Sequence, residues 1–192
     1  KNPDNPNNNL KFNKLFLLPS GEIFLSTYQG GCVRVTTDKK TLALHSEWVQ
    51  HKNIAVETKV NEVFQDKEAN VWLLTDKGIY LRDSTEKSNV YYENLPFYSH
   101  YDNDKHIFFG SNGKIFQFDK RSKSFLSIEL PHHATVNKMV SLSATHFLFT
   151  THNQGFYTYD ILREKLQYFD LNQFTQLSSK VILETYVDKI GD

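Results

Sequence analysis

The chain has 192 residues, of which 39% are hydrophobic and 23% are charged, proportions typical of a folded globular protein and not of a disordered one. Basic and acidic residues number 22 each, so no net charge attracts a phosphate backbone or an anionic bilayer, and direct nucleic-acid contact is not expected. The single cysteine, Cys32, excludes an internal disulfide and a multi-cysteine zinc site, and its neighbours indicate a small buried strand residue.

Residues 1–14 are rich in Asn and Pro, which favour turns and extended loops, so they are predicted to lead into the first strand without joining a sheet. They lack the basic and apolar regions of a secretory signal, and no apolar run in the chain approaches the roughly 18 residues that cross a bilayer. Because the chain begins with Lys1 and not with Met, we expect it to be part of a longer polypeptide.

Residues 15–192 repeat one pattern, in which an apolar run containing a bulky residue leads through a Gly-containing turn to a second apolar run. The bulky residues are Phe24, Trp72, Phe108 and Leu148, at intervals of 48, 36 and 40 residues, the length of a four-stranded propeller blade. Fifteen Phe and ten Tyr also favour strands. We therefore predict an all-β propeller with about four blades, at about 15–47, 60–94, 97–130 and 136–171, as a fragment of a larger propeller.

The second repeat shows the expected meander, with strands at 62–65, 71–75 and 79–81 separated by polar turns. Gly78, Gly113 and Gly155 precede the third strands of their repeats, where a tight turn requires positive φ, and are predicted to be structural.

The last residues, at 180–192, match the first strand and turn of a partial fifth repeat, with Asp188 in the place of Asp66. Two interpretations follow. The chain is part of a larger propeller, because a blade without its remaining strands leaves an unpaired edge, or this strand completes the first blade and closes a small ring.

The second repeat, VNEVFQDKEANVWLLTDKGIYLRD, resembles the regulator-propeller repeat of hybrid two-component systems in Bacteroidetes. Ala69 replaces the Gly of that motif's first turn, and Leu74 replaces its strand Gly. The third repeat keeps Gly110 and the fourth keeps Gly155, while NPDNPNNNL resembles a phrase that often precedes blades in this family. The residues that match the motif are Asp66, Asn70, Trp72, Thr75, Gly78 and Ile79.

The resemblance implies a place in the periplasmic sensor region of an inner-membrane protein, with the histidine kinase domain outside this chain. It also implies an oligosaccharide ligand, contacts with neighbouring propeller and sensor domains of the same polypeptide, a homodimer, and no catalytic residue of the kinase in this segment. No cofactor and no metal site is expected here. The alternatives are a propeller that hydrolyses or cleaves a glycan, which glycan turnover would reveal, and an interaction scaffold of the WD-repeat type. The scaffold is disfavoured because no Trp-Asp pair ends any repeat.

The chemistry-bearing residues have structural explanations. Trp72 is predicted to pack between blades, because its equivalents share only bulk. His132 and His133 would point to opposite sides of an extended surface segment, and His146 and His152 lack a third metal ligand. The Asp and Glu candidates are explained by turns, and no nucleophile elbow, P-loop, dinucleotide motif or zincin motif is present. These acidic residues are Asp66, Glu68, Asp76, Asp102 and Asp104.

The turns between second and third strands are the predicted ligand-binding elements, because polar loop residues on one face of a propeller can hydrogen-bond sugar hydroxyls. Solvated hairpin loops would have the same composition. Tyr91, Tyr92, Tyr98 and Tyr101 are further candidates for contact. The predicted ligand-binding residues are Tyr28, Gln29, Asp76, Lys77, Ser111, Asn112, His152, Asn153 and Gln154.

Overall fold

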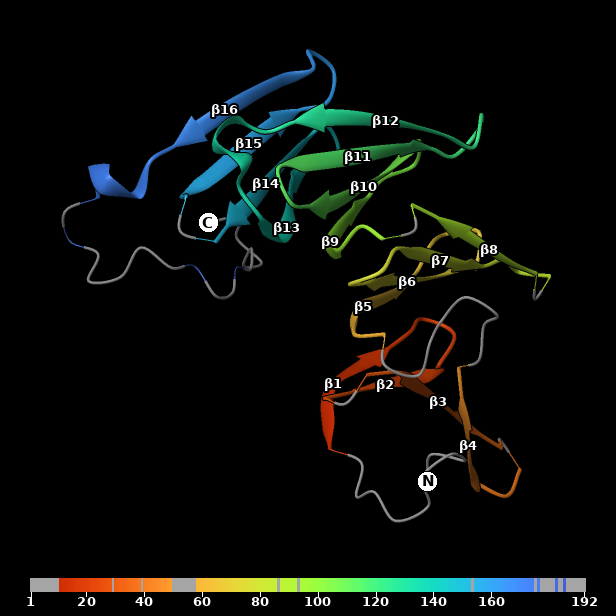
Figure 1. Cartoon of the computed structure of the whole chain (residues 1–192). Coiled ribbons are helices and arrows are strands. Elements are labelled where there is room, and N and C mark those ends of the chain that lie inside the picture. The colour runs from red at the N-terminus through yellow and green to blue at the C-terminus, as the bar shows by residue number, and fades with distance from the viewer. Residues whose placement is uncertain are drawn as a thin grey trace. The chain divides into compact units, whose positions relative to one another are not determined.

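The computed structural model describes residues 11–28, 30–38, 40–49, 58–85, 87–92, 94–152 and 154–174, together with residues 176, 182 and 185. These residues form four antiparallel sheets of four strands each, and in every sheet the strands follow one another in chain order (Figure 1). The prediction of an all-β chain built from four-stranded blades is confirmed. By its contacts the chain divides into two compact units, residues 1–97 and 98–192.

Unit 1 contains the first two sheets. The predicted strand 71–75 is β6, and the third strand of that repeat extends one residue further than predicted, to Arg82. The first sheet consists of β1 (Phe12–Leu17), β2 (Ile23–Thr27), β3 (Cys32–Thr37) and β4 (Leu44–Trp48). The second sheet consists of β5 (Val60–Gln65), β6 (Val71–Thr75), β7 (Ile79–Arg82) and β8 (Ser88–Tyr91).

Unit 2 contains the other two sheets, apart from Phe97, the first residue of β9, which falls in unit 1. The third sheet consists of β9 (Phe97–Asp102), β10 (His106–Ser111), β11 (Lys114–Asp119) and β12 (Ser124–Glu129). The fourth consists of β13 (Val136–Ser143), β14 (His146–Thr151), β15 (Phe156–Asp160) and β16 (Lys165–Phe169). Two 3-10 helices, Pro131–His133 and Leu171–Gln173, follow the third and fourth sheets.

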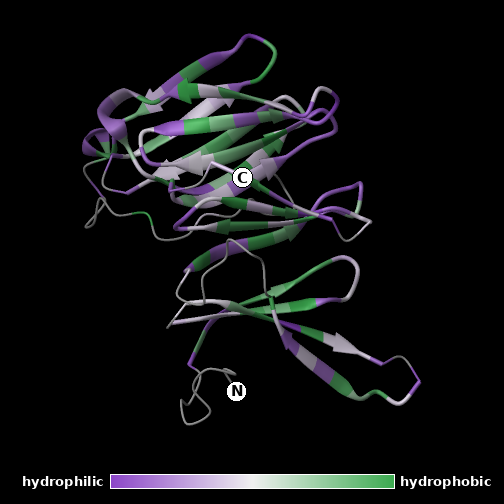
Figure 2. Ribbon diagram, turned by 45° about the vertical axis from the view of Figure 1, so that its right-hand side comes forward, coloured by the Kyte–Doolittle hydropathy of each residue, from purple (hydrophilic) through white to green (hydrophobic). Residues whose placement is uncertain are grey.

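The alternation of side chains along each strand explains how sheets stack within a unit. In unit 1, Phe24 of β2 lies in a core with Leu73 and Tyr80 of the second sheet. In unit 2, Phe108 of β10 lies in a core with Phe147 and Tyr157 of the fourth sheet. In both units, the face that carries the bulky repeat residue thus packs against the next sheet along the chain. Figure 2 shows hydrophobic residues concentrated in the strands and hydrophilic residues at many of the turns.

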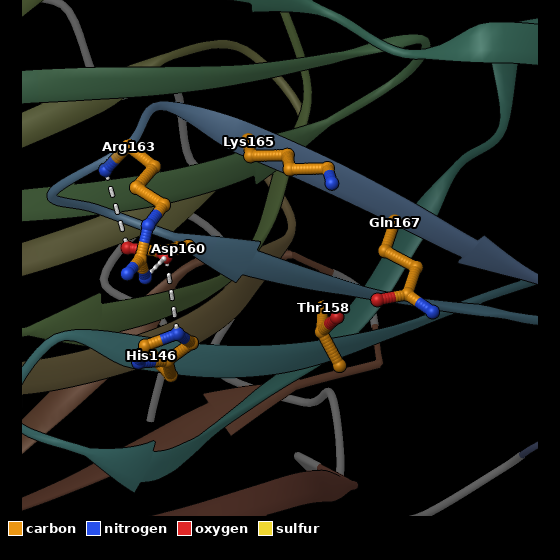
Figure 3. Close-up of a pocket in the computed structure, with 6 residues that line it drawn as sticks. All are labelled: His146, Thr158, Asp160, Arg163, Lys165 and Gln167. Atoms are coloured by element: carbon orange, nitrogen blue, oxygen red, sulfur yellow. Dashed lines mark hydrogen bonds and ion pairs between the residues drawn. The ribbon is translucent and has the colours of Figure 1, made fainter.

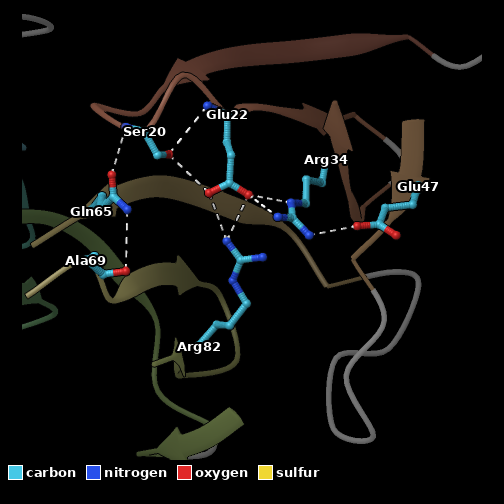
Figure 4. A network of polar contacts seen from close by, with 7 residues as sticks. All are labelled: Ser20, Glu22, Arg34, Glu47, Gln65, Ala69 and Arg82. Carbon is cyan, nitrogen blue, oxygen red and sulfur yellow. Dashed lines mark hydrogen bonds and ion pairs between the residues drawn. The ribbon is translucent and has the colours of Figure 1, made fainter. Parts of the chain in front are cut away.

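Polar contacts also join the two sheets of unit 1 (Figure 4). Arg82 of β7 donates to both carboxylate oxygens of Glu22 at 3.1 Å, and its guanidinium lies 5.9 Å from the ring centre of Phe24. Arg34 of β3 forms an ion pair with the same carboxylate. Burial alone would raise the pKa of Glu22, but the hydrogen bonds and charges of Arg82 and Arg34 outweigh burial and lower it. Glu22 therefore stays ionised at the sheet interface.

The repeat motif of the second sheet forms a closed set of hydrogen bonds. Asp66 Oδ2 accepts the indole N–H of Trp72 at 2.7 Å and the side-chain amide of Asn70 at 2.9 Å. Asp66 Oδ1 accepts the backbone N–H groups of Glu68 and Asn70. Ala69, in the place of the motif Gly, has φ of 64°, the left-handed conformation that Gly adopts without strain. Trp72 is 1% exposed, so its predicted burial is confirmed, and its ring stacks on Phe64 and Tyr91 of the same sheet.

Among the described residues, no helix combines the length and the apolar character required to cross a bilayer.

Candidate functional site

Buried hydroxyl groups anchor the hairpin turns between the second and third strands. In the first, second and fourth sheets, a buried threonine at the end of the second strand donates its hydroxyl to the carbonyl of a turn glycine. Thr27 bonds Gly30, while Thr75 and Thr151 bond Gly78 and Gly155 at 2.9 and 2.8 Å. The third sheet has Ser111 at this position, 2% exposed. These hydroxyl bonds hold the turns in place, so exposed turn residues are presented from a fixed base.

Glycine is required in two of these turns for a second reason. A Cβ on Gly78, whose φ is 149°, would lie 2.9 Å from the carbonyl oxygen of Tyr92. A Cβ on Gly155, with φ of 87°, would press still closer on the carbonyl oxygen of Phe169. The predicted structural role of these glycines is confirmed, because any side chain would collide with the backbone at the end of the neighbouring fourth strand.

The structure separates the predicted ligand-binding residues into exposed and enclosed ones. Ser111 is buried and Asp76 is half-buried, so their side chains offer little surface. Gln29 and Asn153 lie outside the described residues. The exposed candidates are Tyr28, Lys77, Asn112, His152 and Gln154.

In unit 1 the carboxylate of Asp76 is used by the chain itself. Asp76 Oδ1 accepts the backbone N–H of Lys59 at 2.9 Å, and the backbone N–H of Asp76 donates to the Lys59 carbonyl at 3.0 Å. The neighbouring carbonyl, of Thr58, accepts the N–H of Gly31 from the turn of the first sheet. Residues 58 and 59 therefore join the two turns of this unit. Among the turn candidates here, Tyr28, which is 70% exposed, and Lys77 keep exposed side chains.

In unit 2 one residue joins the two turns. The hydroxyl of Thr135 donates to Asn112 Oδ1 at 2.8 Å, and the Thr135 carbonyl accepts the backbone N–H of His152 at 3.0 Å. The structure thus brings Asn112 and His152, 40 positions apart in the sequence, to the same residue. Both residues are exposed, and the sequence predicted their proximity only from repeat position.

The geometry predicted for the two adjacent histidines is wrong. His132 and His133 lie in a 3-10 helix and have φ of 65° and 49°, so they are not on an extended segment. Both are exposed, as expected of a surface loop, and the His132 ring lies 5.5 Å from the ring of Tyr168. Within the part of the chain that the structure describes, no three His, Cys, Asp or Glu side chains are grouped to hold a metal ion.

The other candidates have mixed outcomes. The predicted turn roles of Asp66 and Asp76 are confirmed by their bonds to backbone N–H groups, but Asp102 ends strand β9 and pairs with the buried ammonium of Lys120 at 2.7 Å. Tyr101 is 7% exposed and donates its hydroxyl to the Ser143 carbonyl at 3.1 Å. Tyr101 is therefore a core residue and is not available for ligand contact.

Sequence reasoning missed the aspartate that begins the turn between the third and fourth strands of each sheet. Each accepts two backbone N–H groups of its turn through one carboxylate oxygen, and each has a lowered pKa. Their intervals of 45, 36 and 41 residues follow the repeat closely enough to have revealed them. They are Asp38, Asp83, Asp119 and Asp160.

The fourth sheet carries a hollow of about 310 Å³ that the sequence did not predict (Figure 3). It lies on the face of β14, β15 and β16 that carries Leu148, the face opposite the core residues of unit 2. The residues that line it are His146, Thr158, Asp160, Arg163, Lys165 and Gln167.

Asp160 is the centre of the charge arrangement in the hollow. His146 Nε2 lies 3.3 Å and Arg163 Nη1 lies 2.7 Å from Asp160 Oδ2. The hydrogen bond from Arg163 lowers the pKa of Asp160 despite partial desolvation, with help from the turn N–H groups and His146. The third sheet repeats the pair, with His106 Nε2 3.6 Å from Asp119 Oδ2. The hollow therefore combines an ionised carboxylate with two cationic side chains, Arg163 and Lys165.

No protein-family model and no curated protein matches this chain. Solved structures do match it. The extracellular domain of the hybrid two-component system BT4673 from B. thetaiotaomicron superposes with a TM-score of 0.73 at 16% identity, over 96% of this chain and 26% of that one. The corresponding domain of BT3049 from the same organism gives 0.70 at 12% identity, over 96% and 27%. PorZ, a surface component of the type-IX secretion system of Porphyromonas gingivalis, gives 0.70 at 14% identity, over 94% and 30%.

At these identities the similarity establishes the fold, and the chain is part of a β-propeller. It spans about a quarter of the length of the two matching extracellular domains. The resemblance that the second repeat predicted is confirmed as a structural match to the propeller domains of hybrid two-component systems.

Proposed function

We propose that this chain is part of the ligand-sensing propeller region of a hybrid two-component regulator, outside the cytoplasm, and that the region responds to an oligosaccharide. The observation that carries the proposal is the structural match to the extracellular domain of BT4673 over 96% of the chain. In this proposal the segment binds and transmits, while the catalytic domain of the kinase lies elsewhere in the polypeptide.

The exposed turn residues support a role in binding polar ligands. Tyr28 offers an aromatic face, and Lys77, His152 and Gln154 offer hydrogen-bonding groups, on turns that buried hydroxyl groups hold in place. Asn112 offers a side-chain amide whose oxygen accepts the hydroxyl of Thr135. In unit 1 the ring of Tyr28 suits the apolar face of a sugar, and in unit 2 the polar groups of Asn112, His152 and Gln154 suit its hydroxyls. These residues are therefore the proposed contacts.

Isothermal titration of the full-length polypeptide with a panel of plant and host oligosaccharides tests the proposal. We expect one class to bind, and we expect Asn112→Ala or His152→Ala to weaken binding about tenfold, the loss of one or two hydrogen bonds. Lys77→Ala has a matched control in Lys87→Ala, an exposed lysine on the other turn flanking β7, which should leave binding unchanged. Binding that no turn variant weakens would overturn the assignment of these residues.

The same samples distinguish a binding module from an enzyme. Chromatography of each oligosaccharide after prolonged incubation should return it intact. Shortened or unsaturated products would overturn the proposal in favour of a propeller that hydrolyses or cleaves glycans.

A further inference from the structure

The face of the fourth sheet that carries Leu148 and the hollow, called the outer face below, is equivalent to faces that are covered elsewhere. In unit 2 the equivalent face of the third sheet, with Phe108, packs against Phe147 of the next sheet. In unit 1 the equivalent face of the first sheet, with Phe24, packs against Leu73 of the next sheet. Each unit therefore uses this face as an interface to the sheet that follows in the chain.

The outer face is an interface that is only partly covered. Phe24 and Phe108 are 2% and 0% exposed, whereas Leu148 is only half-buried. Thr150, on the same face, is buried, and its hydroxyl has no hydrogen-bond partner among the described residues. Its equivalent in the third sheet is Gly110, where a Cβ would lie 2.8 Å from the Cβ of Val136. By this equivalence, the inner strand of a following sheet would pack against Thr150.

A repeated hydrogen bond identifies where that strand begins. In the second sheet the side-chain amide of Asn61 donates to the carbonyl of Phe97, the first residue of β9, at 2.8 Å. In the fourth sheet the equivalent residue, Asn137, donates to the carbonyl of Ile182 at 3.1 Å. The second bond gives Ile182 the place that Phe97 has in the third repeat.

The sequence motif gives the same register independently. Asp66 follows Val60, the first residue of β5, by six positions, and Asn103 follows Phe97 by six. Both side chains accept backbone N–H groups of the turn after the inner strand. Asp188 follows Ile182 by the same six positions.

We infer that Ile182 opens the inner strand of a further four-stranded sheet of the same polypeptide, and that this sheet covers the outer face, including the hollow. The hollow is then an interface and not a ligand pocket. Charged interfaces of this kind exist in the chain already, because Arg82 of the second sheet reaches across to Glu22 of the first. The matching extracellular domains are long enough to supply such a sheet, since this chain spans 26% and 27% of them.

The side chains of the first sheet argue against it as the cover of the outer face, whether it comes from this chain or from a second copy. The face of the first sheet away from Phe24 carries Leu15, Leu17 and Leu44, which are 63%, 68% and 70% exposed. These leucines offer no partner to Asp160 or Lys165 in the hollow, and the exposed polar side chains of that face, Thr37 and Ser46, carry no charge, so pairing would bury charges without opposite charges beside them. A following repeat can supply polar partners, as the second sheet does for the first.

Thiol labelling of the full-length polypeptide tests the inference. Thr158→Cys lines the hollow, and Leu162→Cys, in the exposed turn after β15, is its control. We expect the cysteine at 158 to react at least about tenfold more slowly than the one at 162, because reaction requires the covering sheet to open. Cys32 is 1% exposed, and burial raises its thiol pKa to about 12, so it will not interfere. Equal labelling rates would overturn the inference.

A crosslink tests the register. The spacing between Gly110 and Val136 predicts that Thr150→Cys and Ile182→Cys together form a disulfide on oxidation, because their Cβ atoms should lie within disulfide range. The pair Thr158→Cys and Ile182→Cys, one strand further out, should not. Crosslinking of the second pair, or of neither, would contradict the register.

Discussion

The second and fourth sheets follow the same chain path but hold their bulky repeat residue in different ways. In the second sheet Trp72 is 1% exposed, and its indole N–H is bonded to Asp66. In the fourth sheet the equivalent residue is Leu148, half-buried, and the turn before it is capped by Ser143, whose hydroxyl accepts the N–H groups of Thr145 and His146 at 3.3 and 3.1 Å.

The comparison shows what the repeat motif does physically. Asp66 connects a turn to a buried side chain, so the motif is a packing and turn-closing device. Where the motif has diverged, as in the fourth sheet, the strands keep their order and pairing because backbone hydrogen bonds and alternation suffice for those. Divergence of the motif removes the bulk of the tryptophan side chain and the hydrogen bond that anchors it.

The largest expected difference between the two sheets is the cost of truncating the bulky residue. Trp72→Ala should reduce the free energy of unfolding by about 3–5 kcal/mol, because it removes a fully buried aromatic side chain and leaves a cavity. Leu148→Ala should cost less, about 2–3 kcal/mol, because the inferred further sheet covers Leu148 in the full-length polypeptide but leucine is smaller than tryptophan and has no anchoring hydrogen bond. Urea denaturation of the full-length polypeptide, followed by fluorescence and circular dichroism, measures both.

A Leu148→Ala cost of about 1 kcal/mol or less would contradict the further sheet inferred above, because a covered Leu148 would lose a full set of packing contacts.

The next effect concerns the anchor of the indole. Asp66→Ala should cost about 1–3 kcal/mol, because the N–H of Trp72 and two turn N–H groups lose their acceptor, the indole N–H in a buried setting. Ser143→Ala in the fourth sheet should cost about 0.5–1.5 kcal/mol, since its bonds are exposed to water. The same denaturation experiment applies. Equal costs would show that the Asp66 bonds to Trp72 add nothing to turn capping.

A smaller effect, an increase in the free energy of unfolding, is expected from a substitution at Ala69 in the same turn. Ala69→Gly should stabilise the second sheet by about 0.5–1 kcal/mol, because Gly adopts a φ near 64° without the strain that a Cβ imposes. Glu68→Gly is the control, and it should destabilise, since Gly only adds unfolded-state entropy there. A loss of stability in Ala69→Gly would show that the Ala methyl group contributes more packing than its conformation costs.

The smallest expected difference is in the pKa values of two turn aspartates and in how they respond to salt. The pKa of Asp83 is lowered first by a hydrogen bond from the Thr85 hydroxyl, and that of Asp160 first by Arg163. A folded-state pKa below the unfolded value of about 3.9 stabilises the fold above that pH, and the contribution is lost as the pH falls through the folded value. NMR titration should find both below 3.9, and added salt should raise the pKa of Asp160 more, because only its main partner is charged. Equal salt responses would contradict the role assigned to Arg163.

The fold could be predicted from this sequence to a large extent because its signals are local. The intervals between Phe24, Trp72 and Phe108, and the Gly residues before third strands, report turn geometry that a residue must satisfy wherever the strand lies. The histidine pair failed because its backbone depends on the adjacent hairpin. His133 packs beside Gly113, and Pro131 accepts the hydroxyl of Tyr157, neither of which is visible in the local sequence.

The candidate site could be predicted only in part. Repeat position located the turns between second and third strands, but it could not show that Asp76 binds the backbone of Lys59, or that Thr135 brings Asn112 and His152 together. Those contacts join segments 17 to 23 positions apart, which strand pairing brings together. The sequence does not indicate which polar side chains are occupied by hydrogen bonds within the chain.

The sequence by itself determined the class of fold, the repeat and the residues of the tight turns, because periodicity and positive φ are properties of short segments. Only the tertiary structure decided which polar groups remain exposed, where charges such as Glu22 and Asp160 meet their partners, and which sheet face lacks a cover. Those properties depend on distances between segments, which stacking of the sheets sets and a linear pattern does not contain.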